Sequence, residues 1–196
     1  MAYNWPTNIV PNAQKFTFIS YFQDHESPLT RTEQSNSDVS VLLQIEFGFP
    51  MLNQDDGLLA LAHLGRAMRD EYVVPYKQAG VIYPTTDTMT LGAGATGSSL
   101  PIVGIPSGYA FKDGQLFSLI DTDGRRYNYQ VGADSAAGAA NRTITLNADI
   151  RKPHASGCVL EIKEPKIQGK IKPDNRVLDL DVAYLSQINF TIKEAR

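Results

Sequence analysis

The chain has 196 residues, of which 42% are hydrophobic and 20% charged, and its net charge at pH 7 is −3. This composition supplies a folded core and excludes a disordered chain, and the negative charge without a basic patch argues against a general nucleic-acid binder. The single cysteine, Cys158, excludes an internal disulfide, and no apolar run approaches the roughly 20 residues of a membrane span. The start of the chain lacks the features of a secretory signal, so we expect folding in a reducing cytoplasm.

The first 36 residues predict an extended arm and two strands. Residues 1–14, with Trp5 and two prolines, favour an arm without regular structure. In Lys15–Phe22, phenylalanines alternate with polar residues, which predicts a strand. The segment Leu29–Asn36 predicts a polar strand, which belongs at a sheet edge or against another chain, although a solvated hairpin arm is an equal alternative. Its candidate inter-subunit residues are Leu29, Thr30, Arg31, Thr32, Glu33 and Gln34.

The stretch from 37 to 69 predicts a long strand followed by the only convincing helix. Apolar side chains occupy the odd positions of Asp38–Phe49, the period of a half-buried strand. Asn53 is a favourable N-cap residue, and acidic residues follow it where the helix dipole favours them. We expect about four helical turns. The apolar side predicted to cover a sheet contains Leu58, Leu61, Ala62 and Met68.

From about residue 89 the pattern changes to short strands separated by turn signals. Asp123-Gly124 lies between two alternating runs and predicts a tight hairpin, because these residues tolerate positive φ angles. About five strands without a helix predict a small barrel of OB type. After a possible short strand at Tyr72–Tyr76, the predicted strands are Leu100–Val103, Gln115–Ile120, Arg125–Val131, Thr143–Leu146 and Cys158–Glu161.

The end of the chain returns to the long alternating style. Apolar residues take all but one of the even positions in Val177–Ile192, and such a strand needs the early strands as partners. We therefore predict a discontinuous first domain, 1–88 with 165–196, and an inserted barrel at 89–164. Residues 1–88 hold five basic and ten acidic side chains, whereas 89–164 hold seven of each. The predicted fold is mainly β with one packed helix.

No motif assembles catalytic or cofactor-binding chemistry. Residues 92–97 match G-x-G-x-x-G, but the prolines and glycine that follow exclude the helix that a dinucleotide site requires. Asp121-Thr122-Asp123-Gly124 resembles the start of a calcium loop, yet the twelfth position is Gly132 instead of glutamate. The three histidines lie in separate segments without metal-ligand spacing. We expect no enzyme activity, no cofactor and no metal.

A carbohydrate-binding module is one alternative from a different class. Tyr109, Tyr127 and Tyr129 in the predicted barrel are candidate stacking platforms for a glycan. Tyrosines at alternating strand positions more often pack into a core with the hydroxyl at its rim.

Several segments together resemble the distal tail proteins of long, flexible-tailed phages. In the first half these are Ser27-Pro28-Leu29-Thr30, Thr32-Glu33-Gln34, Phe47-Gly48-Phe49-Pro50-Met51 and the acidic helix start. In the second half they are Gly97, Phe111–Leu119, Arg126-Tyr127, Gln130-Val131 and Ile144–Leu146, which resemble the inserted OB-type domain of that family. The motifs are mostly structural, and no catalytic residues are carried over.

The resemblance implies a structural virion protein that forms a homohexameric ring at the tail tip. One face of the ring would meet the tail tube protein and the other the tail hub, with tube-like β-sandwiches around the channel and barrels pointing outward, available to receptor-binding or side-fibre proteins. DNA would pass through the lumen without specific binding, for which an acidic lining is suitable. Assembly would take place in the host cytoplasm, without a membrane. The alternative within this class is a tail tube or tail-terminator protein.

Overall fold

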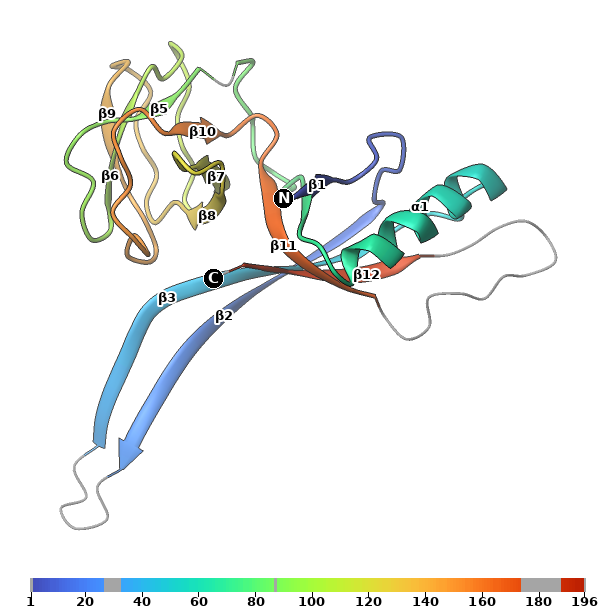
Figure 1. The fold of residues 1–196 in the computed structure, drawn as a ribbon. Coiled ribbons are helices and arrows are strands. Elements are labelled where there is room, and N and C mark those ends of the chain that lie inside the picture. Colours follow the sequence, from blue (N-terminus) through green and yellow to red (C-terminus); the bar gives the residue numbers. More distant parts are fainter. Residues whose placement is uncertain (1, 27–32, 87, 174–187, 196) are drawn as a thin grey trace.

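The protein is mainly β, as the sequence predicts, and its described residues form two six-stranded sheets and one helix. The computed structural model describes residues 2–26, 33–86, 88–173 and 188–195, and within these it describes residues 20–40 by their backbone alone. Figure 1 shows the second sheet beside the upper end of β11 in the first, with a long hairpin extending away from both. None of the helices in these ranges is long and apolar enough to cross a membrane.

The first sheet has the strand order β1, β4, β11, β12, β3, β2. β1 and β4 pair in parallel, and every other pairing in this sheet is antiparallel. Its strands are β1 (Tyr3–Asn4), β2 (Ala13–Glu26), β3 (Glu33–Gly48), β4 (Tyr72–Pro75), β11 (Lys166–Pro173) and β12 (Asn189–Glu194). The predicted strand Val177–Ile192 lies outside the described residues up to 187, and β12 contains its last four residues.

The helix α1 (Gln54–Ala67) packs on one face of the first sheet (Figure 1). The Asn53 side chain accepts a hydrogen bond from the Asp56 N–H at 2.8 Å and caps the helix as predicted. The predicted buried side is wrong, because Leu58 is 59% exposed and Met68 is 72% exposed. The buried positions are instead Gly57, Ala60, Leu64 and Ala67. Three of these side chains are small and allow the helix backbone to approach the sheet closely.

The N-terminal residues are part of the core, contrary to the predicted unstructured arm. Trp5 is 3% exposed, and its ring centroid lies 4.8 Å from that of Phe190 and 5.5 Å from that of Phe49. Its indole N–H donates to the carbonyl of Ile9 at 3.1 Å. Burial of the largest side chain of the chain explains why this segment is ordered.

Strands β2 and β3 form the hairpin that extends from the body (Figure 1). The predicted polar strand Leu29–Asn36 is not a separate element: residues 29–32 lie outside the described residues, and Glu33–Asn36 begin β3. Glu33 pairs with Glu26 of β2, within the same chain. A register shift at Ser20/Tyr21 leaves two residues of β3 without partners in β2, as in a β-bulge.

The second sheet has the order β8, β7, β10, β5, β6, β9 and is not a closed barrel. A single isolated bridge between Val131 and Leu146 joins the residues that directly follow β8 and β9. The predicted hairpin is confirmed, because Gly124 has φ 79° between the antiparallel strands β7 and β8. The strands are β5 (Thr90–Leu91), β6 (Ser99–Val103), β7 (Leu116–Ile120), β8 (Arg126–Gln130), β9 (Arg142–Thr145) and β10 (Val159–Glu161).

Candidate functional site

The junction between the two sheets contains a fully buried carboxylate near the end of the chain. The Glu194 side chain is 0% exposed and ends β12. Its oxygens accept hydrogen bonds from the backbone N–H of Leu43 at 3.1 Å, the backbone N–H of Asn128 at 2.7 Å and the Arg151 guanidinium at 2.5 Å. Asn128 also accepts from the Tyr76 hydroxyl at 2.8 Å. One carboxylate thus joins β3 and β12 of the first sheet to β8 of the second.

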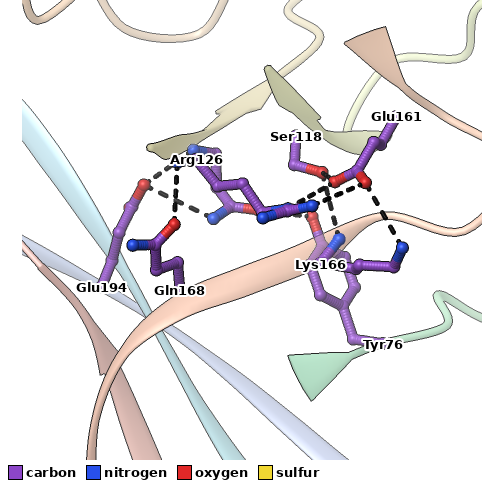
Figure 2. Close-up of polar contacts among 8 residues, drawn as sticks. Tyr76, Ser118, Arg126, Glu161, Lys166, Gln168 and Glu194 are labelled. Atoms are coloured by element: carbon purple, nitrogen blue, oxygen red, sulfur yellow. Dashed lines mark hydrogen bonds and ion pairs between the residues drawn. The ribbon is translucent and has the colours of Figure 1, made fainter. Parts of the chain in front are cut away.

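A second group of charges lies beside it in the same junction (Figure 2). Arg126 of β8 donates to both oxygens of Glu161 of β10, at 2.8 and 3.1 Å. Lys166 of β11 donates to Glu161 at 3.3 Å, and its backbone N–H donates to the Ser118 hydroxyl at 3.1 Å. The backbone N–H of Arg126 donates to Gln168 of β11 at 3.1 Å. Side chains from both sheets therefore complete one network.

The electrostatics of the network favour the ionised form of Glu161. Burial alone would raise the pKa of Glu161, but the hydrogen bonds and charge of Arg126 and the charge of Lys166 lower it below its usual value. Buried charges contribute little net stability when paired, but an unpaired one is strongly destabilising. The network therefore specifies how the second sheet lies on the first.

A further group of ionisable side chains lies in the second sheet. The Asp121 carboxylate, 5% exposed, contacts the Lys152 ammonium, and its Oδ1 lies 3.3 Å from Nδ1 of His154. The other ring nitrogen of His154 lies 2.7 Å from the Tyr129 hydroxyl. The Cys158 thiol donates to the same Asp121 oxygen at 3.5 Å. This group has the connectivity of a proton relay, from tyrosine through histidine to aspartate.

The environment of these groups does not suit catalysis. Burial raises the pKa of Tyr129 to about 12, so its hydroxyl is a poor nucleophile at neutral pH. Burial also lowers the pKa of His154 and raises that of Cys158, which favours the neutral ring and the protonated thiol. The His154 side chain is 0% exposed, so a substrate has no access to it. The group completes the interior of the second sheet.

The three candidate glycan-stacking tyrosines are all buried. Tyr109, Tyr127 and Tyr129 are 8%, 7% and 5% exposed. Arg151 lies over the rings of Tyr127 and Tyr129, at 5.2 and 5.4 Å from their centroids. A sugar could stack on these rings only after displacing side chains that already cover them.

The glycine motif and the metal-ligand types form no binding site in the described ranges. After residues 92–97 the chain enters strand β6, so no helix N-terminus faces the glycines. Within the same ranges, no group of three or more His, Cys, Asp or Glu side chains is arranged to hold a metal ion.

Two surfaces of the first sheet are suited to contacts with other chains. On α1, large apolar side chains point outward. In the hairpin, only Gln44–Gly48 of β3 pair with β12, so the earlier residues of β3 extend beyond that partner strand. The other strand of the hairpin, β2, is the edge strand of the sheet. The exposed apolar residues on and next to α1 are Met51, Leu58, Leu59 and Met68.

Sequence reasoning did not identify the junction between the sheets. Its charged members come from separate segments of the chain, and nothing in the sequence pairs Glu194 with Arg151, 43 residues away. One signal was present: Glu194 continues the even positions of Phe190 and Ile192, which are buried. A charged residue on the buried side of a strand indicates a partner in the interior.

No protein-family model matches the chain, and no curated protein matches it.

Proposed function

We propose that this chain is a structural virion protein that forms a hexameric ring at the distal end of a phage tail, joins the tail tube to the tail hub and lines the DNA channel. The observation that carries the proposal is the β2–β3 hairpin, which continues for many residues beyond the last partner of β3 in β12 (Figure 1). A strand edge with free hydrogen-bonding groups pairs readily with another chain. The hairpin supplies such edges on both of its sides.

The outer side of α1 supports assembly independently. Leu58, Leu59 and Met68 lie on a helix whose buried side is made largely of small residues. Large apolar side chains on an exposed helix surface are typical of protein–protein contacts. Burial of this surface between neighbouring copies in a ring would stabilise the assembly.

The division of the chain fits the domain arrangement of a tail-tip adaptor. The first sheet uses strands from residues 1–88 and 165–196, and we propose that it is the tube-like, ring-forming domain. The second sheet uses strands between 89 and 164, and we propose that it is an inserted OB-like domain facing outward. The bridge from Val131 to Leu146 supports this, because it brings together the two edges that a barrel would close.

Electron microscopy and light scattering of the purified protein test the proposal. We expect closed six-membered rings with six times the chain mass of 21.5 kDa, about 129 kDa. A protein that stays monomeric at high concentration would count against the proposal.

A variant with a shortened β2–β3 hairpin tests whether the end of the hairpin is needed for ring assembly. Gln23 and Asn36 are paired partners in the hairpin. Replacing residues 24–35 by Asn-Gly connects them through a two-residue turn. The core of the first sheet is untouched, so we expect an unchanged unfolding transition with loss of rings. Intact rings in this variant would show that the removed residues 24–35, which include Leu29–Gln34, are not needed for assembly.

A further inference from the structure

The face of the first sheet opposite α1 carries a cluster of basic side chains. Lys170 and Lys172 of β11, Lys193 of β12 and Arg125 before β8 line an open hollow of 360 Å³. We call these four residues and the space between them the basic hollow. The remaining lining residues are Gln44, Glu71, Thr191, Glu194 and Ala195.

The acidic residues of the hollow are engaged elsewhere. Glu194 accepts from Arg151, Asn128 and Leu43 in the junction. Glu71 accepts a hydrogen bond from the side chain of Gln168 at 3.0 Å. The four basic side chains of the hollow nevertheless outnumber the two carboxylates that line it, so the formal charge of the lining is positive.

Two lysines of the hollow face each other across the pairing of β11 with β12. Lys170 and Lys193 are direct cross-strand partners in the β11–β12 pairing. Like charges directly opposite one another destabilise a sheet. Among the residues that the structure describes, neither Lys170 nor Lys172 forms an ion pair with a carboxylate. A negatively charged group from another molecule would remove this repulsion.

The first turn of α1 carries a matching acidic surface. Asp55 is exposed and Asp56 half-buried, and neither forms an ion pair with any described cation. Asp56 accepts a hydrogen bond from Asn8 at 2.5 Å. Exposed Met51 and Leu58 flank the two carboxylates and add apolar contact area.

The acidic turn and the basic hollow lie on opposite faces of the same sheet. Side chains alternate between faces along a strand. Ile45 of β3 belongs to the core that α1 covers, whereas its neighbour Gln44 lines the hollow. One copy therefore cannot bring its own acidic turn to its own hollow.

We propose that the basic hollow of one copy receives the acidic first turn of α1, with Asp55 and Asp56, from a second copy. This inference rests on the proposed ring and names a contact within it. Two different, complementary patches on each copy give a head-to-tail contact, which is the type that closes into rings. Asp55 and Asp56 would offset two positive charges of the hollow and so reduce its attraction for DNA.

Nucleic acid fits the hollow less well than a protein surface. The whole chain has a net charge of −3, which disfavours the approach of a phosphate backbone. A hollow of 360 Å³ accommodates a few side chains, whereas duplex DNA needs an extended basic surface.

Charge reversal with rescue tests the contact. The variant Lys170→Glu/Lys172→Glu places like charges against Asp55 and Asp56, so we expect its assembly constant, measured by light scattering, to fall at least about tenfold. Adding Asp55→Lys/Asp56→Lys in the same chain exchanges the charges across the contact and restores assembly. The matched control is Lys77→Glu/Lys112→Glu, at exposed lysines outside the hollow, which leaves assembly unchanged.

The outcomes separate this inference from the ring proposal. Rings that survive Lys170→Glu/Lys172→Glu overturn the contact and leave the ring proposal standing. Rings lost in that variant and not restored by the exchange overturn the acidic turn as the occupant. A wild type without rings overturns both proposals. Binding of duplex DNA in a gel-shift assay, abolished by Lys170→Glu/Lys172→Glu, would identify nucleic acid as the occupant and also overturn the contact.

Discussion

Away from the junction, the interior of the first sheet consists mainly of aromatic and aliphatic side chains, whereas the interior of the second includes a group of ionisable ones. Trp5, Phe47, Phe49 and Phe190 pack ring against ring below α1. In the second sheet, Asp121 and His154 are buried among tyrosines instead.

This difference separates two ways of stabilising a small β structure. Apolar burial is non-directional and changes little with pH, so the first sheet depends on shape and close packing. Buried ionisable groups depend on each partner and on protonation. We therefore expect the first sheet to be sensitive to volume changes, and the second sheet and the junction to be sensitive to charge and pH.

The largest effect is expected for Gly169→Ala in β11. A Cβ atom at this position would lie 1.8 Å from the carbonyl oxygen and 2.7 Å from the carbonyl carbon of Lys193. Backbone atoms of a paired strand cannot move that far without separating β11 from β12. We expect an insoluble protein, or a loss of more than about 4 kcal/mol in the free energy of unfolding in urea.

The matched control is Gly65→Ala on the exposed side of α1. No atom lies within 4 Å of a Cβ built there, and alanine favours a helix over glycine. We expect this variant to gain about 0.5–1 kcal/mol. Equal stability of the two variants would show that the close contact with the Lys193 backbone is not what requires glycine at position 169.

The next effect is expected for Arg151→Met in the junction. It leaves the fully buried Glu194 carboxylate without its cation, so we expect a loss of about 3–5 kcal/mol in urea unfolding. The control is Lys15→Met, whose exposed pair with Glu46 contributes at most about 1 kcal/mol.

The double variant Arg151→Met/Glu194→Gln sharpens this result. With both charges removed, we expect much of the lost stability to return, because no uncompensated charge remains in the interior. A single Arg151→Met variant no less stable than Lys15→Met would mean that the junction does not depend on the ion pair.

The smallest effect is a pH dependence from His154. Burial holds its pKa in the folded protein below the value of about 6.5 in the unfolded chain. The unfolded state therefore binds more protons below pH 6.5, and stability decreases as the pH falls from there through the folded-state pKa. The slope for one proton is at most about 1.4 kcal/mol per pH unit.

Urea unfolding at pH 7, 6 and 5 measures this slope. We expect His154→Gln to be less stable at pH 7 but flatter between pH 7 and 5. His63→Gln in the first sheet is the control, because burial lowers the pKa of His63 as well but this residue is half-exposed on α1. If His63→Gln flattened the change of unfolding free energy with pH more than His154→Gln does, the first sheet and not the second would be the pH-sensitive one.

Several elements could be predicted because their signals are local. The alternation in β3, the Asn53 cap of α1 and the Asp123-Gly124 turn each depend on neighbours within a few residues. Strand β11 was missed, although Ile167 and Ile171 on its odd positions are buried. Lysines and Gly169 between them weakened the pattern that marks a strand.

The side of α1 that faces the sheet could not be predicted from the sequence. The sequence offers apolar residues on more than one side of this helix, and hydrophobicity alone favours Leu58 and Met68 for burial. The structure buries Gly57, Ala60 and Ala67 instead. The deciding factor is the distance between helix and sheet, which no local pattern specifies.

The sequence by itself determined the mainly β class, the helix after Asn53 and the change of pattern near residue 89, because backbone preference and side-chain period act over short distances. Only the tertiary structure decided that Glu194 meets Arg151, that β3 and β2 form one long hairpin, and that lysines of β11 and β12 share one face. These depend on strand order and register, which bring together residues far apart in the chain.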